Sequence, residues 1–438
     1  MSGRATMNRR TFNRLLGAGA VTAAATATTA CGGSSSGSSD GAVRYAWWGD
    51  AVRQKNYEAA LAVFSKENPD VTVRPEFADY TAFQERITVQ MAGRNVPELF
   101  WIPSPQVLTY EAAGLYRTLD DLEDFDLSDY PPELLETFKL GGQLNTMPRS
   151  VFTPCVRWNQ TFLEEAGAEL PAYDEASWTW DALAEFLIDY SADNPQGRKG
   201  AAYCANGDMV FESWVRQHGG DLWTEEGTLG FEPEVLEGWF AWWENLRAKG
   251  ATLELSEQEG ADGEWSLIGE KALLTLQNSN HIVDEAQQFP DYDFQQRMTP
   301  ANADATPGFR FGYLSRIAMY ARTAEGSLPG AAKLLNFNLN DARMVSQTGL
   351  TVGAPANPRI LAEIRPDATP DEIKLLDLVD EEMKLEQRPR YEAPPGSGTW
   401  RDVMARTIEA VTLGSTSIPD ASAAFISEVS REIDAAKK

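Results

Sequence analysis

Residues 42–50 read AVRYAWWGD, a mostly apolar run that ends at Gly49-Asp50. An apolar run bounded by turn residues predicts a buried strand and the loop that follows it. Large apolar residues then recur at helical spacing, at positions 57, 61 and 64, until Asn68-Pro69-Asp70 ends the helix. A short apolar run at residues 71–73 predicts the next strand, so this region has the order strand, helix, strand.

The same alternation continues along the chain. A helix is predicted through Phe83, Ile87 and Met91, and a third strand over residues 98–102. This order predicts an α/β fold with a mostly parallel sheet and helices on both of its faces. Ligands of such sheets bind beyond the carboxyl ends of the strands, so we expect the functional residues in the loops that follow the strands.

A second α/β unit is expected from about residue 150. Its predicted strands cover residues 151–158, 201–205 and 271–276, and its predicted helices include residues 234–249. A strand-like run at residues 310–320 and a last helix from residue 399 complete the pattern. The length of 438 residues agrees with two or three domains at roughly 150 residues each.

The charge and residue counts exclude several functions. Acidic side chains outnumber basic ones by 65 to 38, so a nucleic acid partner, which needs clustered Lys and Arg, is excluded. With two His and three Cys, we expect no metal site and no cofactor. The sequence has no glycine-rich phosphate loop and no glycine-bracketed serine elbow, so those enzyme classes are not indicated. Because carboxylates are abundant, composition alone does not exclude a glycosidase.

The first forty residues indicate export. Residues 1–30 contain four Arg, no acidic residue and an apolar run too short to span a bilayer, which is typical of a signal peptide. The pair Arg9-Arg10 resembles a twin-arginine signal, and Thr28-Thr29-Ala30-Cys31 resembles a lipoprotein box that ends at a lipidated Cys31. Residues 31–41 are rich in Gly and Ser and predict a flexible tether. The alternative is an ordinary cleaved signal with an incidental Cys31.

Two further cysteines, Cys155 and Cys204, fall in predicted strands. A disulfide is permitted outside the cytoplasm, so these residues could be joined or could remain as two buried free thiols.

Five stretches of the chain, taken together, resemble extracellular solute-binding proteins of family 1, which serve ATP-binding-cassette importers. The similarity is to the branch of maltose and oligosaccharide binders, and it extends over roughly residues 42–420. The stretches are AVFSKENPDVTV (62–73), MAGRNVPELF (91–100), AGLYRTLD (113–120), VRWN with FLEEAG (156–167) and SWTWDAL (177–183).

The resemblance implies a type II periplasmic-binding-protein fold, in which two α/β lobes are joined by three crossings and a ligand cleft lies between them. The first lobe is expected over residues 42–149 plus 314–354, and the second over residues 150–313 plus 355–438. The crossings are expected near residues 150–154, 313–317 and 353–357.

The function implied is that of a non-enzymatic, monomeric receptor. It would capture a sugar or oligosaccharide, deliver it to the membrane permease subunits of the importer and stay on the outer face of the cell membrane through Cys31. One alternative is the same fold with another solute, such as a polyamine, glycerol phosphate or an iron complex. Another is a secreted polysaccharide-active enzyme or an adhesive lipoprotein.

Aromatic rings stack on the C–H faces of sugars, and polar side chains bond to their hydroxyl groups. On this basis the candidate ligand-binding residues are Trp48, Asp50, Tyr80 and Ser104 in the first lobe and Glu212, Trp214, Asn278, Asn280, Trp400 and Arg401 in the second. Trp47 and Trp48 are neighbours in a strand and point to opposite faces, so one of them is expected in the core.

Several of these residues also have a simpler interpretation. Asp50 could serve as a helix N-cap, and Asn278 and Asn280 suit a turn. Arg401 could be a solvated residue of a first helical turn. Trp400 follows a Pro/Gly loop at a helix start, and it matches a Trp that stacks on sugar in the maltose-like branch.

Overall fold

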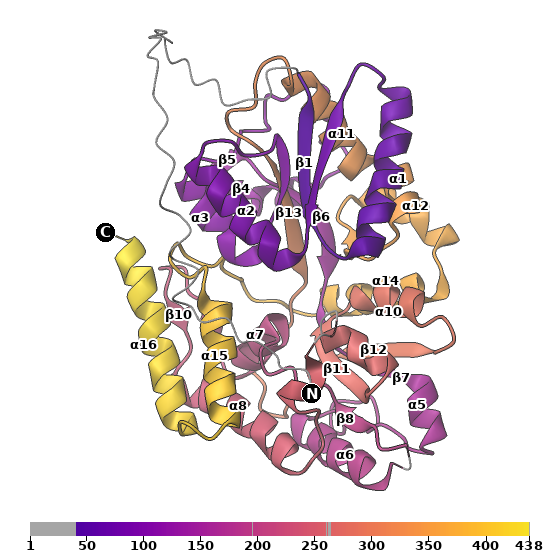
Figure 1. Ribbon diagram of the computed structural model, residues 1–438, viewed down its shortest axis with the longest axis vertical. Coiled ribbons are helices and arrows are strands. Elements are labelled where there is room, and N and C mark those ends of the chain that lie inside the picture. Colours follow the sequence, from indigo (N-terminus) through magenta and orange to yellow (C-terminus); the bar gives the residue numbers. More distant parts are fainter. Residues whose placement is uncertain (1–40, 195, 260, 262–263, 438) are drawn as a thin grey trace, which may run out of the picture. The chain divides into compact units, whose positions relative to one another are not determined.

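A computed structural model gives the coordinates of the protein and describes residues 41–194, 196–259, 261 and 264–437 (Figure 1). The predicted signal peptide at residues 1–30, the predicted lipidation site Cys31 and the tether up to residue 40 lie outside the described residues. No helix among the described residues is long and apolar enough to cross a bilayer.

A six-stranded mixed sheet forms the core of the first lobe, which we call lobe 1. Its strand order is β14-β6-β13-β3-β1-β2, in which β1 pairs in parallel with β2 and β3, and the other neighbours are antiparallel. The strands are β1 (Val43–Trp48), β2 (Val73–Ala78), β3 (Leu99–Ile102), β6 (Met147–Phe152), β13 (Tyr313–Met319) and β14 (Ala354–Pro355).

Helices cover both faces of this sheet because successive side chains of a strand point to opposite sides. Tyr45 and Trp47 pack with helices α1 (Ala51–Glu67), α11 (Leu328–Asn340) and α12 (Ala342–Thr348). Ala46 packs on the other face with helices α2 (Tyr80–Ala92) and α3 (Val107–Ala112). The smaller elements of this region are η2 (Ser104–Gln106), α4 (Pro132–Glu136), β4 (Lys139–Leu140) and β5 (Gln143–Leu144).

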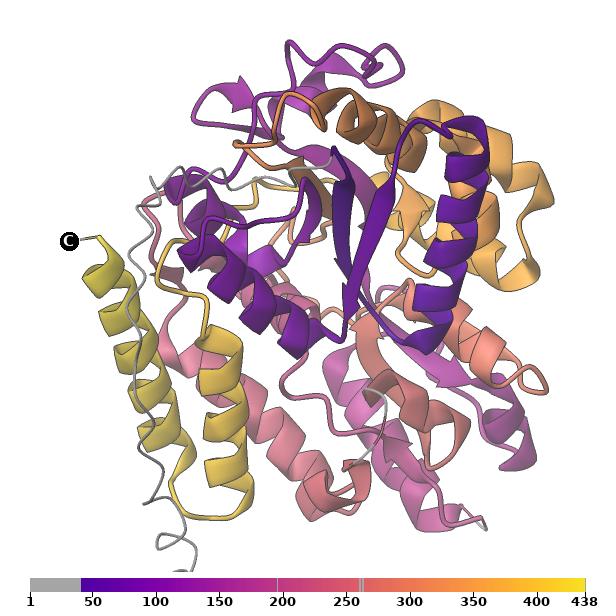
Figure 2. The same cartoon turned by 45° about the horizontal axis from the view of Figure 1, so that its top comes forward.

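A four-stranded sheet with the order β12-β7-β11-β8 forms the core of lobe 2. Its strands are β7 (Pro154–Asn159), β8 (Lys199–Ala201), β11 (Ala272–Asn278) and β12 (Phe294–Met298). The largest apolar core joins this sheet to α5 (Gln160–Glu165), α6 (Trp180–Asp193), α7 (Asp208–Gln217), α8 (Pro233–Ala248), α15 (Trp400–Thr412) and α16 (Ile418–Ala436). Helices α15 and α16 run side by side, with α16 against α8 (Figure 2).

A second apolar cluster joins β12 to α10 (His281–Gln288) and α14 (Pro370–Met383). The remaining elements are β9 (Asp221–Trp223), β10 (Leu229–Gly230), α9 (Leu255–Gln258), η3 (Glu264–Gly269), α13 (Pro358–Ile364) and η4 (Arg365–Asp367). The predicted strand at residues 201–205 is shorter than expected, because β8 ends at Ala201 and the chain then turns toward α7.

Three connections link the two sheets. Strand β6 of lobe 1 continues through Thr153 into β7 of lobe 2, as Figure 1 shows. The second connection runs from β12 to β13 and the third from β14 to α14. The exact residue boundaries of the lobes, expected at 42–149 plus 314–354 and at 150–313 plus 355–438, stay a prediction.

Cys155 and Cys204 are buried and are not joined by a disulfide, so the disulfide alternative does not hold. Cys155 lies on β7 and Cys204 follows β8, and β11 lies between these two strands. Two strand spacings amount to roughly 9–10 Å, which is more than a disulfide can span between Cα atoms. The sulfur of Cys204 instead lies 3.2 Å from Oγ1 of Thr275.

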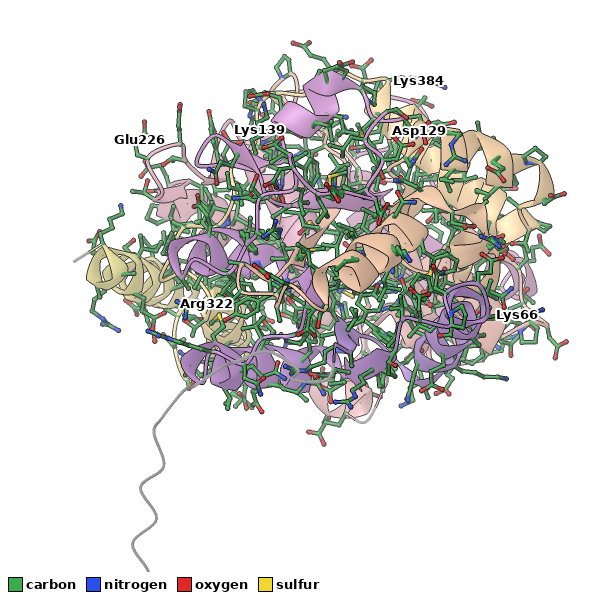
Figure 3. All side chains as sticks on the ribbon, turned by 90° about the horizontal axis from the view of Figure 1, so that it is seen from above. Lys66, Asp129, Lys139, Glu226, Arg322 and Lys384 are labelled. Carbon is green, nitrogen blue, oxygen red and sulfur yellow. The ribbon has the colours of Figure 1, made fainter. Side chains whose placement is uncertain are left out.

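Charged side chains lie mainly at the surface. Figure 3 labels Lys66, Glu226, Arg322 and Lys384 around the outside of the ribbon, and all four are exposed. Few charged side chains of the described residues are buried, and the net charge of -27 favours solubility.

Glu382 on α14 is an exception that makes stability depend on pH. Its side chain is buried, Oε2 has no hydrogen-bond partner among the described residues, and Nη1 of Arg310 is 3.7 Å away. Burial raises the pKa of Glu382 to about 7, against the opposing charge of Arg310. Between the ordinary pKa and about 7 the folded state binds more protons than the unfolded state, so stability falls as pH rises through this interval.

We expect Glu382→Gln to remove this part of the pH dependence. Relative to the wild type, the variant should gain up to about 3 kcal/mol in free energy of unfolding between pH 5 and pH 8. Urea denaturation at several pH values measures the difference. The exposed Glu409 on α15 supplies the control, because it does not act on Glu382 and Glu409→Gln should leave the pH dependence unchanged. The prediction would be contradicted if the free energy of unfolding of Glu382→Gln differed from that of the wild type by the same amount at every pH.

Candidate ligand-binding cleft

A cavity of about 390 Å³ lies between the two lobes. This volume is within the range of roughly 300–1,000 Å³ that is typical of small-molecule sites. Lobe 1 contributes the ends of β1 and β3, as expected for ligands that bind beyond strand ends, and lobe 2 contributes the end of β11 and the starts of α7 and α15. The residues on which the site depends are Trp48, Asp50, Arg53, Tyr80, Trp101, Ser104, Arg149, Asp208, Asn278, Asn280, His281, Thr351 and Arg401.

Trp48 forms the aromatic wall of the cavity, while its neighbour Trp47 is fully buried in the core of lobe 1. Neighbouring side chains of β1 therefore point to opposite faces of the sheet, as the sequence predicts for Trp47 and Trp48. The ring of Trp48 is packed edge-on against Trp101 at 5.0 Å and against Tyr80 at 5.4 Å, and it also contacts Phe83. Contacts on several sides fix the ring in one orientation before any ligand arrives.

The loop after β1 positions two charged residues. Asp50 is the N-cap of α1, where Oδ1 accepts a hydrogen bond from the backbone N–H of Arg53 at 2.7 Å, and Asp50 also lines the cavity. Both interpretations of Asp50 are therefore compatible. A Cβ atom at Gly49 would lie 2.5 Å from Cδ of Arg53, so the glycine leaves room for the Arg53 side chain to fold under the loop.

Arg401 connects the two lobes across the cavity. From the first turn of α15 its guanidinium donates to the Tyr80 hydroxyl at 2.7 Å and to the Ser104 hydroxyl at 2.8 Å, both in lobe 1. It also forms an ion pair with Asp208 of lobe 2. Burial opposes the charge of Arg401, but the Asp208 carboxylate holds the pKa of Arg401 above its ordinary value. Three of the predicted residues, Tyr80, Ser104 and Arg401, thus meet in one network.

The loop after β11 forms the lobe 2 wall. The side-chain amide of Asn280 donates to the backbone carbonyl of Thr351 at 2.7 Å, which is a second contact between the lobes. The side-chain oxygens of Asn278 and Asn280 and the hydroxyl of Thr351 are buried and have no hydrogen-bond partner among the described residues. Because these three residues also line the cavity, they are candidates for hydrogen bonds to a ligand that carries hydroxyl groups.

Two ionisable groups support this loop. His281 lies 2.9 Å from Asp284, but burial lowers the pKa of His281 below its ordinary value, so we expect the neutral form at neutral pH. Behind the loop, the fully buried Arg157 makes a two-pronged ion pair with the fully buried Glu285. Arg157 also donates to the backbone carbonyl of Asn278, so this ion pair fixes the position of the cavity wall.

Three predicted ligand-binding residues lie outside this cavity. Trp214 packs in a cluster of buried tryptophans with Trp180 and Trp239, and its indole N–H donates to a backbone carbonyl. Trp400 is 3% exposed and packs edge-on against Trp223 at 5.9 Å. Contrary to the prediction, their rings belong to the apolar core of lobe 2, because helices α7 and α15 turn these positions inward.

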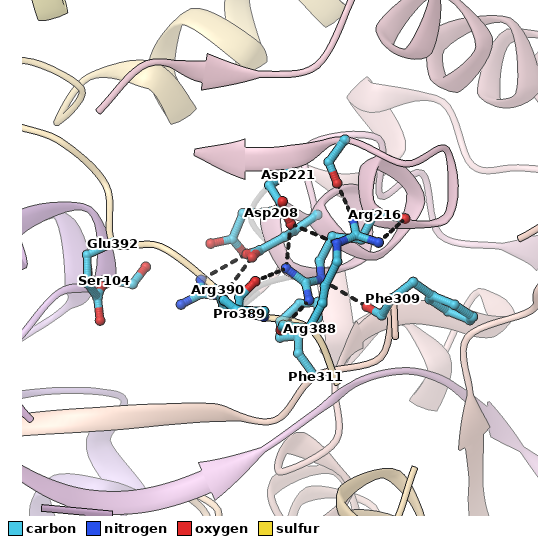
Figure 4. A network of polar contacts seen from close by, with 12 residues as sticks. Ser104, Asp208, Arg216, Asp221, Phe309, Phe311, Arg388, Pro389, Arg390 and Glu392 are labelled. Atoms are coloured by element: carbon cyan, nitrogen blue, oxygen red, sulfur yellow. Dashed lines mark hydrogen bonds and ion pairs between the residues drawn. The ribbon is translucent and has the colours of Figure 1, made fainter. Parts of the chain in front are cut away.

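Glu212 is also excluded from the cavity, because it pairs with Arg390 at 2.7 and 2.8 Å. Figure 4 shows the surrounding network, in which Arg216 of α7 donates to the backbone carbonyls of Phe309 and Pro389 and pairs with Asp221. These bonds attach the segment around Arg390 to α7. Together with Trp400, Glu212 lines only a small void of about 10 Å³ beside the cavity.

Sequence reasoning missed Arg53, Arg149 and Asp208. Arg53 lies in the first turn of α1 and Asp208 begins α7, so both stand at helix starts, where a search of residues after predicted strands could have found them. Arg149 lies inside β6, and no local pattern distinguishes it from a solvated strand residue.

Comparisons with known proteins agree on the fold. The chain matches the family model described as bacterial extracellular solute-binding protein over residues 59–374. The diacetylchitobiose-binding protein DasA of Streptomyces coelicolor is 27% identical over 151 residues, which are 32% of this chain and 36% of that protein. The match therefore spans only about a third of the relative's length.

Solved structures of similar proteins cover nearly the whole described chain. A periplasmic oligogalacturonide-binding protein from Yersinia enterocolitica, in complex with saturated digalacturonic acid, has a TM-score of 0.80 at 18% identity, with 90% of this chain and 99% of that chain covered. A periplasmic solute-binding protein from Pectobacterium atrosepticum has a TM-score of 0.78 at 19% identity, with 90% and 99% covered. The GacH receptor of Streptomyces glaucescens, which was also solved with acarbose, has a TM-score of 0.72 at 16% identity, with 90% and 98% covered. At these identities the likeness establishes a shared fold.

Proposed function

Since the chain belongs to the bacterial extracellular solute-binding protein family, we propose that it captures a saccharide in the cavity between its two lobes. The observation that carries the proposal is the make-up of the cavity wall. The fixed ring of Trp48 lines the same cavity as the polar side chains of Asn278, Asn280 and Thr351. A sugar needs both kinds of surface, because it has apolar C–H faces and a rim of hydroxyl groups.

The names of similar proteins support the same ligand class. DasA is named for diacetylchitobiose, the Yersinia protein for oligogalacturonides, and GacH was solved with acarbose. The cavity also gives no support to a polyamine, because its three aspartates are matched by three arginines and the lining therefore has no excess of negative charge.

The proposed role is that of the binding component of an ATP-binding-cassette importer. Arg401 bonds to Tyr80 and Ser104, and Asn280 bonds to Thr351, so in this arrangement the lobes are held together across the cavity. A ligand that contacts both lobes would favour the closed state of the protein. Permease subunits that recognise both lobes would favour the same state, so ligand-bound protein would bind the permease preferentially. We further propose that a lipid on Cys31 keeps the protein on the outer face of the cell membrane.

Titration of the purified mature protein with a panel of neutral and acidic mono- and oligosaccharides tests the proposal. At a ligand concentration of about 100 Kd, a bound member should stabilise the fold by about 3 kcal/mol and raise the unfolding temperature. It should also change the fluorescence of Trp48. Spermidine serves as the negative control. If no saccharide raises the unfolding temperature or changes the fluorescence, the proposed ligand class is wrong.

A further inference from the structure

Three arginines line the cavity, and the protein supplies a carboxylate for two of them. Arg401 is paired with Asp208, and Nη2 of Arg53 lies 3.6 Å from Asp284. Arg53 also donates to the backbone carbonyl of Thr351 at 3.1 Å. The charges of these two guanidinium groups are therefore at least partly balanced inside the protein.

Arg149 is different. Among the described residues no carboxylate lies within ion-pair distance of its guanidinium, and its single protein hydrogen bond is a long one of 3.5 Å from Nη1 to the Tyr57 hydroxyl. Its Nε atom is buried without a hydrogen-bond partner among the described residues, as are the Nε atoms of Arg53 and Arg401. This occurs in a chain with 65 acidic side chains, 27 more than the basic ones, so the missing counter-charge does not reflect a shortage of acids.

The position of Arg149 is well defined although it has no ion-pair partner in the described part of the chain. Its Cζ atom lies 3.6 Å from the centre of the Trp101 ring, so the guanidinium is stacked beside the aromatic wall of the cavity. Burial lowers the pKa of Arg149, and the charge of Arg53 acts in the same direction. An arginine nevertheless stays protonated in proteins, so the cavity wall carries a positive charge that has no carboxylate within ion-pair distance among the described residues.

A buried charge is normally paired, and the planar fork of a guanidinium matches the planar, doubly accepting carboxylate. We propose that the natural ligand is an acidic saccharide, a uronic acid or its oligomer, whose carboxylate is bound by Arg149 beside Trp101. This inference rests on the proposed function and narrows it from saccharides in general to carboxylate-bearing ones. The carboxylate of the ligand would be recognised by the nearby charge of Arg149. The acidic surface of the protein opposes this little, because charges further than about 10 Å away are screened at physiological salt.

Calorimetric titration with matched pairs of sugars tests the inference. The probes are mono- and digalacturonate and mono- and diglucuronate, each beside its neutral counterpart, which has a CH₂OH group in place of the carboxylate. The wild type should bind at least one acid about 10- to 100-fold more tightly than its neutral partner. Arg149→Met should weaken binding of the acid by about 10- to 100-fold relative to its neutral partner and so abolish the preference. Arg149→Lys should restore only part of the preference, because an ammonium lacks the planar fork.

Arg297 on β12 offers a matched control. Its guanidinium also lies over aromatic rings, 5.0 Å from Trp158 and 5.3 Å from Trp178, but it does not line the cavity. Arg297→Met should therefore leave the preference for acids intact, and circular dichroism with thermal unfolding verifies that each variant is folded. If neutral sugars bind as well as the acids, the inference is wrong and the proposed function stands. If no sugar binds at all, both fail.

Discussion

Replacing Trp48 by alanine is expected to weaken saccharide binding by about 30-fold, which corresponds to about 2 kcal/mol. The physical reason is that Trp48 presents a large apolar surface in the cavity and is held by Tyr80, Phe83 and Trp101, so little side-chain entropy is lost when a sugar stacks on it. Trp48→Phe should lose less, because a smaller ring still covers part of the sugar face. Calorimetric titration with the best ligand of the panel measures the change.

Trp400 provides the control for this prediction. It is buried against Trp223 and does not line the cavity, so Trp400→Phe should lower stability but leave the Kd within about threefold of the wild type. The comparison matters because the resemblance to maltose binders implies a sugar contact at Trp400. If Trp400→Phe weakened binding as much as Trp48→Ala, the ligand would have to reach beyond the cavity described above.

Replacing Arg157 by methionine is expected to cost about 3–5 kcal/mol in free energy of unfolding. Arg157 and Glu285 are both fully buried and are joined by hydrogen bonds of 3.0 and 2.9 Å, so the substitution leaves a carboxylate alone in the core of lobe 2. Burial raises the pKa of Glu285 to about 7 even though Arg157 opposes the shift. Without Arg157 this pKa should rise further, so the loss of stability should be larger at pH 8 than at pH 5.

The double variant Arg157→Met with Glu285→Leu shows how much of the loss of stability comes from leaving the Glu285 carboxylate buried without Arg157. Because an apolar pair of similar volume avoids the cost of burying charge, the double variant should recover most of the stability lost by Arg157→Met. Its stability should also depend less on pH. Chemical denaturation at pH 5 and pH 8 measures all three proteins. Equal destabilisation by the single and double variants would mean that packing around Arg157, and not the lone carboxylate, accounts for the loss.

Local sequence patterns predicted the secondary structure well where the apolar spacing was regular. The predicted helix at residues 234–249 corresponds to α8 (Pro233–Ala248), and the predicted strand at residues 98–102 corresponds to β3 (Leu99–Ile102). The pattern was less informative at residues 201–205. This short apolar run is buried along its whole length, but strand β8 ends at Ala201. Burial and strand pairing are separate properties, and an apolar run alone does not distinguish them.

The candidate site was predicted in part. Residues at the ends of strands, such as Trp48, Asp50 and Asn278, were found because the end of a strand is visible in the sequence and ligands of α/β sheets bind there. Trp214 and Trp400 were misplaced because the side of a helix that faces the core depends on neighbouring helices. Arg149 was missed because it stands out only by having no carboxylate within ion-pair distance among the described residues, which is a property of the folded molecule.

By itself the sequence determined the alternation of strands and helices, the α/β fold and the resemblance to solute-binding proteins, since apolar periodicity and short motifs are local properties of the chain. The tertiary structure decided which aromatic rings reach the cavity, that Cys155 and Cys204 remain separate, and which arginine lacks a counter-charge. These features depend on distances between residues far apart in the sequence, and such distances are fixed only when the sheets and helices pack together.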